Sequence, residues 1–450
     1  MAIKTQDYSL DSCKIVTSNG QVTEFRFILQ DINIYEDIYS NYITGDLKIN
    51  DSVGYLSQLG FNGHEFLILQ FSQPNIPDCQ SISRSFRIYK VSDRHLFRDQ
   101  NEGYTIHFCS EEALLSEQYK ISKSYKSKLV SDIAQDVLKT GLKLNSNALA
   151  TVNIETTKGL RDIIIPNMKP FETLNWLCTQ ALSATNVGAD YLFYENYFGY
   201  NFATLQSLYS ANVPQNLKFK YEPKNIQQTN STAASENMIN VFAFEVVNNF
   251  DTIYTNSSGA LANRLIAVDI LRQNYTITDF DYSKYFASAK KLNPNGILSN
   301  YQNRFGDTDN KVFNSTLKSV TTNTGESTYN QYIKAHDPTI KDINIETTVP
   351  YRTAQISQIN YIRYKLSVPG NPTLTVGKVI EFNLPEMTRT TDGKNADKYY
   401  SGKYLITSIK HKIDIENRFV TLMEISKESL PNPYDGVNNA SSAQLNQVAK

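Results

Sequence analysis

The sequence from Phe25 to Phe71, FRFILQDINIYEDIYSNYITGDLKINDSVGYLSQLGFNGHEFLILQF, decides the predicted fold. Apolar and polar residues alternate from Phe25 to Leu29 and again from Leu47 to Ile49, and a third strand-like run spans Phe66 to Phe71. Alternation with a period of two is typical of half-buried β-strands, and clusters such as Asn62-Gly63 mark the reversals between them. The stretch therefore predicts a small antiparallel barrel or sandwich.

Length and hydropathy indicate a large soluble protein. A chain of 450 residues exceeds one ordinary core and predicts three or four domains. Hydrophobic residues make up 40% and charged residues 20%, and no run of about 18 apolar residues could form a transmembrane helix. The first residues lack the apolar core of a signal peptide. We therefore expect folding in a cytoplasm and no membrane insertion.

The charge balance and the cysteines exclude several classes of site. The 44 basic and 45 acidic residues give a net charge of −1, and no basic run stands out, which argues against sustained nucleic-acid binding. Cys13, Cys79, Cys109 and Cys178 lie far apart and form no CxxC pair, so we expect reduced thiols rather than disulfides or a metal site. The 29 Tyr and 22 Phe fit a β-rich assembly protein.

The periodicity changes along the chain and predicts mainly β structure with α+β parts. After the first β-region a helical period appears, with a short helix near Ser110, a helix over roughly Ser127 to Thr140, and another starting at Pro170. Tyr191 to Tyr194 reads as a returning strand. The predicted domains are a first β-barrel at 1–110, an α/β domain at 111–210, a second β-barrel region at 211–283 and 349–430, an insertion of weak secondary structure at 284–348, and a flexible C-terminal tail at 431–450.

The first and last β-regions share an order of strands. In both, a glycine precedes one strand, a second strand follows, and a polar reversal leads to a third. The matching segments are Gly63, Glu65–Leu69, Phe86–Val91 and Tyr104–Phe108 in the first region, and Gly377, Val379–Phe382, Tyr404–Ile409 and Phe419–Glu424 in the last. Two unrelated antiparallel barrels can share such a rhythm; duplication of one barrel is the interpretation that we favour.

No catalytic, cofactor-binding or metal-binding residue is predicted. The five histidines are His64, His95, His107, His336 and His411, and none forms an HxH or HExxH pair. Asp307-Thr308-Asp309 begins like a calcium loop, but Lys318 stands where the closing glutamate is needed. Glu172 and Glu195 are conceivable as a glycosidase pair, although carboxylates at helix starts usually complement the helix dipole. We therefore expect a protein that is not an enzyme and has no cofactor.

Several segments resemble the central baseplate hub proteins of contractile-tailed (myovirus-type) bacteriophages, the hub that carries the tail spike. The matching segments, in order, are 35–52 (YEDIYSNYITGDLKINDS), 59–71 (LGFNGHEFLILQF), 166–177 (PNMKPFETLNWL), 201–209 (NFATLQSLY), 264–269 with 280–282, 366–380 (LSVPGNPTLTVGKVI), and 401–411 (SGKYLITSIKH). Each segment is weak evidence alone, but together the segments follow the order of the family across residues 25 to 425. The segment 284–348 and the C-terminal tail resemble no sequence motif of that family.

This resemblance implies a structural role in the virion. The family's architecture is two similar small antiparallel β-barrels plus α/β insert domains, with three chains in a trimeric ring. Such a homotrimer adapts a threefold tail spike protein to the sixfold tail tube or tube-initiating protein, contacts baseplate wedge proteins, and lets DNA pass without specific binding. It would be assembled in the host bacterial cytoplasm and reside in the phage tail baseplate. The alternatives are a receptor- or carbohydrate-binding tail protein and a tail-associated wall hydrolase.

Overall fold

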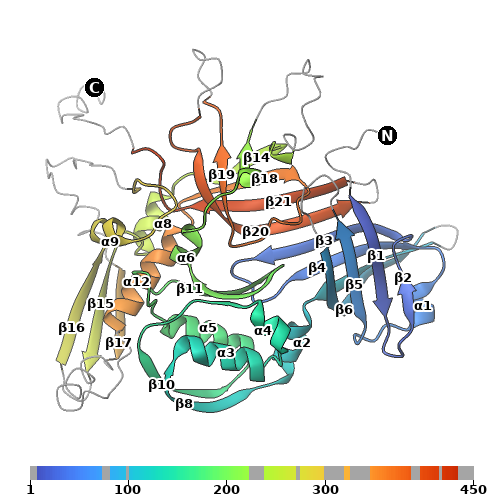
Figure 1. Cartoon of the computed structure of the whole chain (residues 1–450), viewed down its shortest axis with the longest axis horizontal. Coiled ribbons are helices and arrows are strands. Elements are labelled where there is room, and N and C mark those ends of the chain that lie inside the picture. Colours follow the sequence, from blue (N-terminus) through green and yellow to red (C-terminus); the bar gives the residue numbers. More distant parts are fainter. Residues whose placement is uncertain are drawn as a thin grey trace.

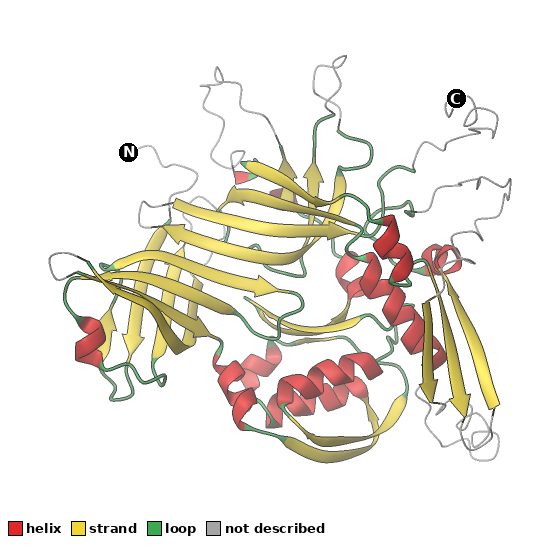
Figure 2. Cartoon of the chain, turned by 180° about the vertical axis from the view of Figure 1, so that it is seen from behind, coloured by secondary structure: helices red, strands yellow, loops and turns green. Residues whose placement is uncertain are grey.

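The computed structural model describes residues 8–72, 82–97, 101–221, 238–269, 274–297, 319–324, 345–386, 396–414 and 418–433. The protein is mainly β with some helices, which confirms that part of the predicted fold class (Figure 2). No helix in these described ranges is long and apolar enough to cross a membrane.

Thirteen strands from the first and last parts of the chain form one large sheet (Figure 1). The strands of the first part are β1 (Ser9–Val16), β2 (Val22–Glu24), β3 (Leu29–Asp37), β4 (Thr44–Asp51), β5 (Phe66–Ser72), β6 (Ile82–Leu96) and β7 (Glu102–Cys109), with helix α1 (Tyr55–Leu59) between β4 and β5. Those of the later part are β13 (Lys218–Lys220), β14 (Ala243–Asn248), β18 (Ile362–Pro369), β19 (Val379–Asn383), β20 (Gly402–Asp414) and β21 (Arg418–Lys427). Two hydrophobic clusters, one under each part, form the cores.

One predicted strand is a turn. Residues 26–28 reverse the chain between β2 and β3, and the Ile28 N–H donates to the Phe25 carbonyl at 3.1 Å. Phe25 is fully buried, whereas Phe27 is 78% exposed. The apolar alternation from Phe25 to Leu29 was therefore wrong as evidence for a strand, because residues 26–28 form a turn in which Arg26 and Phe27 are both exposed.

The middle of the chain packs helices against short sheets. Its elements are α2 (Glu111–Gln118), β8 (Ile121–Leu129), α3 (Val130–Thr140), α4 (Ser146–Ala150), β9 (Asn153–Ile154), β10 (Leu160–Met168), α5 (Pro170–Gln180), β11 (Tyr191–Asn196), β12 (Gly199–Thr204), α6 (Leu205–Tyr209) and the short 3-10 helix η2 (Gln215–Leu217). The helix expected from Ser127 begins at Val130 instead, because β8 pairs with β10 up to Leu129. The helix at Pro170 and the strand at Tyr191 are confirmed.

A further three-stranded sheet stands apart from the large one, at the left of Figure 1. It joins β15 (Ala262–Asp269), β16 (Asn274–Asp281) and β17 (Ser319–Thr324), and the helices α8 (Thr252–Ser257), α9 (Tyr282–Ser288) and α12 (Ile345–Gln358) lie nearby. β15 and β16 therefore pair outside the large sheet, although their residues were predicted to belong to the second β-barrel region. Most of 284–348, and the tail from residue 434, lie outside the described residues.

Helix α12 was missed because its buried side is largely polar. Thr348, Gln355 and Gln358 are buried together with Ala354, so the helix shows no apolar stripe. The Gln358 amide donates to the Ala260 carbonyl at 2.7 Å, and Gln355 donates to the Tyr285 hydroxyl at 2.8 Å. Buried polar side chains of this kind are stabilised by hydrogen bonds, which periodicity cannot reveal.

Candidate assembly site

The first and last β-regions repeat one pattern of strand pairing. In the first, the order of paired strands is β3-β4-β7-β6-β5; in the last, it is β14-β18-β21-β20-β19. All of these pairs are antiparallel. The sequence echo between residues 63–108 and 377–424 is thus confirmed as a repeated strand order, and the repeat extends to two further strands in each region that the echo did not include.

The repeat also holds residue by residue. The ladder of β6 with β7 has a bulge between Ile88 and Lys90, and the ladder of β20 with β21 has one between Ile406 and Ser408. The pairs Arg87–Cys109 and Leu405–Ser426 stand at the same step before each bulge. Gly63 and Gly377 both have positive φ, 84° and 83°, before β5 and β19. A bulge in the same register is a specific structural feature, so chance similarity of two barrels explains it poorly.

The two repeats are joined by a ladder between β20 and β3. Residues Ser408 to Asp414 pair antiparallel with Asp37 to Asp31. Ile413 and Phe419 of the last region lie in the hydrophobic cluster of the first region, and Ile38 of the first lies in the cluster of the last. The joint is therefore both hydrogen-bonded and packed.

Buried polar groups line this joint. Glu36 on β3 is 3% exposed, and its carboxylate accepts from the Val376 N–H at 3.1 Å and from the Thr375 hydroxyl. Burial raises the pKa of Glu36, although these hydrogen bonds act in the opposite direction. His411 on β20 is also buried, its ring lying 3.1 Å from the Thr421 hydroxyl oxygen, and burial lowers its pKa to about 4.

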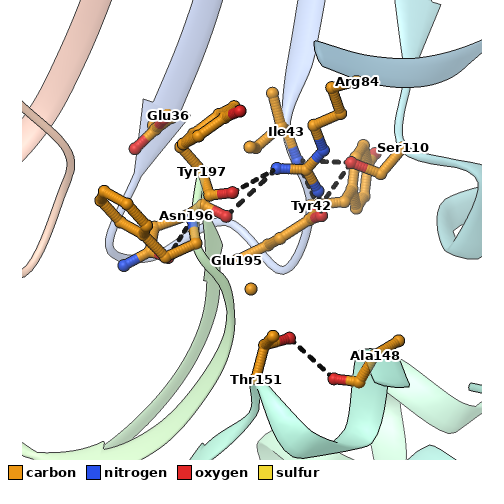
Figure 3. Close-up of polar contacts among 12 residues, drawn as sticks. Glu36, Tyr42, Ile43, Arg84, Ser110, Ala148, Thr151, Glu195, Asn196 and Tyr197 are labelled. Atoms are coloured by element: carbon orange, nitrogen blue, oxygen red, sulfur yellow. Dashed lines mark hydrogen bonds and ion pairs between the residues drawn. The ribbon is translucent and has the colours of Figure 1, made fainter. Parts of the chain in front are cut away.

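An ion pair connects the first β-region to the middle of the chain. The Arg84 guanidinium, on β6, binds the Glu195 carboxylate on β11 and donates to the carbonyls of Asn196 at 3.2 Å and Tyr197 at 3.3 Å (Figure 3). The other Glu195 oxygen accepts from the Ser110 hydroxyl at 2.5 Å and the Ile43 N–H at 2.9 Å. Glu195 is 1% exposed, so these partners, rather than water, stabilise its carboxylate.

The candidate glycosidase pair has other roles here. Glu195 is fully occupied by the contacts above, whereas Glu172 is exposed at the first turn of α5 and accepts from the Lys169 N–H at 3.4 Å. A pocket of about 240 Å³ lies beside Arg84 and Glu195, and Glu112, Thr151 and Phe198 also line it. Arg84 and Glu36 were not predicted from the sequence, where the available signal was a charged residue within an otherwise strand-like run.

The remaining candidate residues are dispersed. His64 and His95 are exposed, and the half-buried His107 ring lies 2.7 Å from the Ser92 hydroxyl oxygen. Cys13, Cys109 and Cys178 are buried free thiols. Within the described ranges no group of three or more His, Cys, Asp or Glu residues could hold a metal ion. His336, Cys79 and the segment Asp307–Asp309 with Lys318 lie outside the described residues.

Each repeat ends in an unpaired strand edge. β14 pairs only with β18, and residues 90–96 of β6 pair only with β7 among the described strands. Both edges carry exposed apolar side chains. On and after β14 these are Val246, Val247, Phe250, Ile253 and Tyr254; on and after β6 they are Tyr89, Leu96 and Phe97. Unpaired edges with exposed apolar groups are typical of surfaces that pair with another chain.

Comparison with known proteins gives relatives for the whole chain. No protein-family model matches it. It is 21% identical over 406 residues to the "Probable baseplate hub protein gp334" of Vibrio phage KVP40, which covers 89% of this chain and 90% of that protein.

Solved structures share the fold at low identity. The 43 kDa tail protein of prophage MuSo2 from Shewanella oneidensis has a TM-score of 0.51 and 9% identity, covering 93% of this chain and 98% of that one. The tail protein from Neisseria meningitidis MC58 has a TM-score of 0.51 and 8% identity, with 94% and 98% covered. The fold is therefore that of phage tail proteins, and the predicted resemblance of this chain to phage baseplate hub proteins is confirmed over nearly its whole length.

Proposed function

We propose that this protein is a structural baseplate hub whose three copies close into a ring. The ring adapts a threefold tail spike to a sixfold tail tube, contacts the baseplate wedges, and forms part of the DNA channel of the virion. The single observation that supports this proposal is the repeated strand order, β3-β4-β7-β6-β5 and β14-β18-β21-β20-β19. Two similar units per chain, which we interpret as two barrels, make six units from three chains.

The repeat predicts how neighbouring chains meet. Within one chain, β20 of one repeat pairs with β3 of the other. The equivalent strands at the opposite ends are β6, over residues 90–96, and β14, and their outer edges pair with no other described strand. Pairing β6 of one copy with β14 of the next reproduces the internal joint between chains. A head-to-tail contact of this kind closes into a ring if the rotation fits.

The register of this contact follows from the internal one. Lys410 on β20 lies opposite Tyr35 on β3. Their equivalents, matched through the pairing registers of both repeats, are Ser92 on β6 and Asn248 on β14. Ser92 of one copy should therefore face Asn248 of the next, with Cβ atoms about 4.5–5.5 Å apart.

Light scattering and cross-linking test this proposal together. Three chains of 51.1 kDa give about 153 kDa, that is 3 × 51.1. The double variant Ser92→Cys with Asn248→Cys should form an intermolecular disulfide and a closed covalent trimer under mild oxidation, since the geometry suits one. Each single variant, and Ser92→Cys combined with Ser146→Cys on the exposed helix α4, serve as controls. A monomer, a closed dimer or a tetramer, alone and with the spike, would contradict the ring.

The alternative functions have less support. A wall hydrolase needs a catalytic constellation, and the described residues contain none that converges in the pocket beside Glu195. A carbohydrate-binding role has no specific observation in its favour within the same residues. A turnover assay on cell-wall material and a glycan-binding screen would detect either activity directly.

A further inference from the structure

One face of the joined sheet is bare, since it is not covered by any other described element, and it carries alternating charges. On β3, β4, β18, β20 and β21, alternate side chains mostly lie in a hydrophobic core, and most of the intervening ones are exposed or half-buried; β14 extends this face with the exposed Glu245. The intervening positions hold six basic and six acidic residues. The basic ones are Lys48, Arg363, Lys365, Lys410, Lys412 and Arg418; the acidic ones are Asp31, Asp37, Asp46, Glu245, Asp414 and Glu424.

The charges form rows across the strands. In one row, Arg418, Asp414, Asp31 and Lys48 lie directly opposite one another on β21, β20, β3 and β4. This row places two carboxylates between two cations. In a second row, Lys365 on β18 stands between Glu245 on β14 and Glu424 on β21.

Three of these six cations form an ion pair with a carboxylate of the same face. The Arg363 Nε donates to Glu424 Oε1 at 2.9 Å, the Arg418 Nη2 lies 3.7 Å from Asp414 Oδ2, and the Lys48 Nζ lies 4.0 Å from Asp31 Oδ2. Neighbouring strands are about 4.8 Å apart, which is less than the Debye length of about 8 Å at physiological salt. A charged group approaching from solvent therefore meets positive and negative charge at once.

The ring contact decides where this face points, and this step rests on the proposed function. The opposite face of the same strands is covered by the hydrophobic cores, under β5, β1, β19 and β13. If β6 and β14 continue the sheet from chain to chain, one face of the closed sheet must turn toward the ring axis. The covered face has its second layer and the helical domain behind it, so the bare face is the one that can line the axis.

We propose that this bare face lines the channel for duplex DNA, and that its own carboxylates keep its lysines and arginines from binding the phosphates. Binding to DNA gains free energy when cations of the protein replace the counterions condensed on the phosphates. A cation that is already paired with a carboxylate of the same face gives little of this gain. The face then offers DNA a polar wall without a net attraction.

A charge-removal experiment tests the inference. The triple variant Asp31→Asn, Asp414→Asn, Glu424→Gln leaves Lys48, Arg418 and Arg363 without their carboxylates. Fluorescence anisotropy with a labelled 30-base-pair duplex would measure affinity from 50 to 200 mM salt. We expect negligible binding by the unmodified chain, at least tenfold tighter binding by the triple variant, and a log–log salt slope steeper by about 3 if three phosphates are contacted.

A matched control separates this face from a general charge effect. The variant Glu117→Gln, Asp132→Asn, Glu172→Gln changes the net charge by the same +3, and it frees Lys169 from its ion pair with Glu117 in the helical domain. It should bind DNA no more than twofold tighter than the unmodified chain. Equal affinities of the two triple variants, or submicromolar binding by the unmodified chain at physiological salt, would overturn the inference. The oligomeric state of the same samples reports separately on the ring.

Discussion

Removal of the Arg84 side chain should destabilise the protein strongly, because it leaves Glu195 buried without a counter-charge. Glu195 is 1% exposed and Arg84 20% exposed. Breaking a buried pair by deleting one partner costs about 3–5 kcal/mol, and the partial exposure of Arg84 places this pair near the lower end, about 3 kcal/mol. For a cooperative unit of 150–250 residues this corresponds to a melting temperature lower by about 6–12 °C.

A double-mutant cycle isolates the cause. Arg84→Met keeps an apolar stem of similar length, whereas Glu195→Gln removes the buried charge but keeps an oxygen that can accept from Ser110 and Ile43. The double variant should be more stable than Arg84→Met alone, with a coupling energy of about 2 kcal/mol. Arg264→Met is the matched control, since Arg264 and Asp279 form an exposed pair with Nε and Oδ1 2.7 Å apart, and its loss should change the melting temperature far less than Arg84→Met does.

Differential scanning fluorimetry and calorimetry on purified variants measure these effects. A decrease below about 2 °C for Arg84→Met, or a double variant that is merely the sum of the two singles, would refute the reasoning. Either result would mean that water or another cation reaches Glu195.

Three further predictions follow from particular contacts. Gly377→Ala should lower the melting temperature far more than Gly63→Ala does. Both glycines have φ near +84°, but a Cβ at Gly377 would lie 2.1 Å from the hydroxyl of a buried tyrosine, whereas a Cβ at Gly63 would enter open space. Melting temperatures of the two variants measure the difference. Burial raises the pKa of Asp190 to about 7, so the folded state holds this proton more tightly than the unfolded one. The stability of the protein should therefore fall as pH rises from about 4 to 7. The variant Asp190→Asn should flatten that part of the plot of melting temperature against pH, and an unchanged slope would contradict the assignment. Truncation after Pro433 should leave the melting temperature unchanged, while truncation before Leu430, which is fully buried and paired with Asn295, should lower it.

The sequence predicted elements whose signal is local. Helix α5 (Pro170–Gln180) begins where it was predicted to begin, because proline suits the first helical turn and Leu174, Leu177 and Cys178 are buried on one side. The order of the strands that the two β-regions share could also be predicted, since apolar and polar residues alternate along the strands and turn residues mark the reversals. These features depend on neighbours within a few positions in the chain.

The elements that depend on distant partners were not predictable in this way. The last residues of β8, Ser127 to Leu129, were predicted as the start of a helix, because the pairing of β8 with β10 cannot be seen in the sequence and its side chains are mostly exposed. The ladder between β20 and β3 joins residues more than 370 positions apart. Arg84 and Glu36 look like ordinary strand charges until the fold places their partners, Glu195 and Thr375, beside them.

The polar contacts of Arg84 also distinguish the two repeats of one chain, which are therefore similar but not identical. The register that matches the repeats places Gly402 of β20 where Arg84 stands in β6, since Gly402 pairs with Phe382 as Arg84 pairs with Leu69. The two repeats thus share their backbone framework and differ at the residue that anchors the first repeat to β11. Each chain would present two similar docking units on one face of the ring and two unlike attachments to its helical domain on the other. In the proposed ring of three such chains, the shared strands would match a sixfold partner and the residues that differ would match a threefold partner.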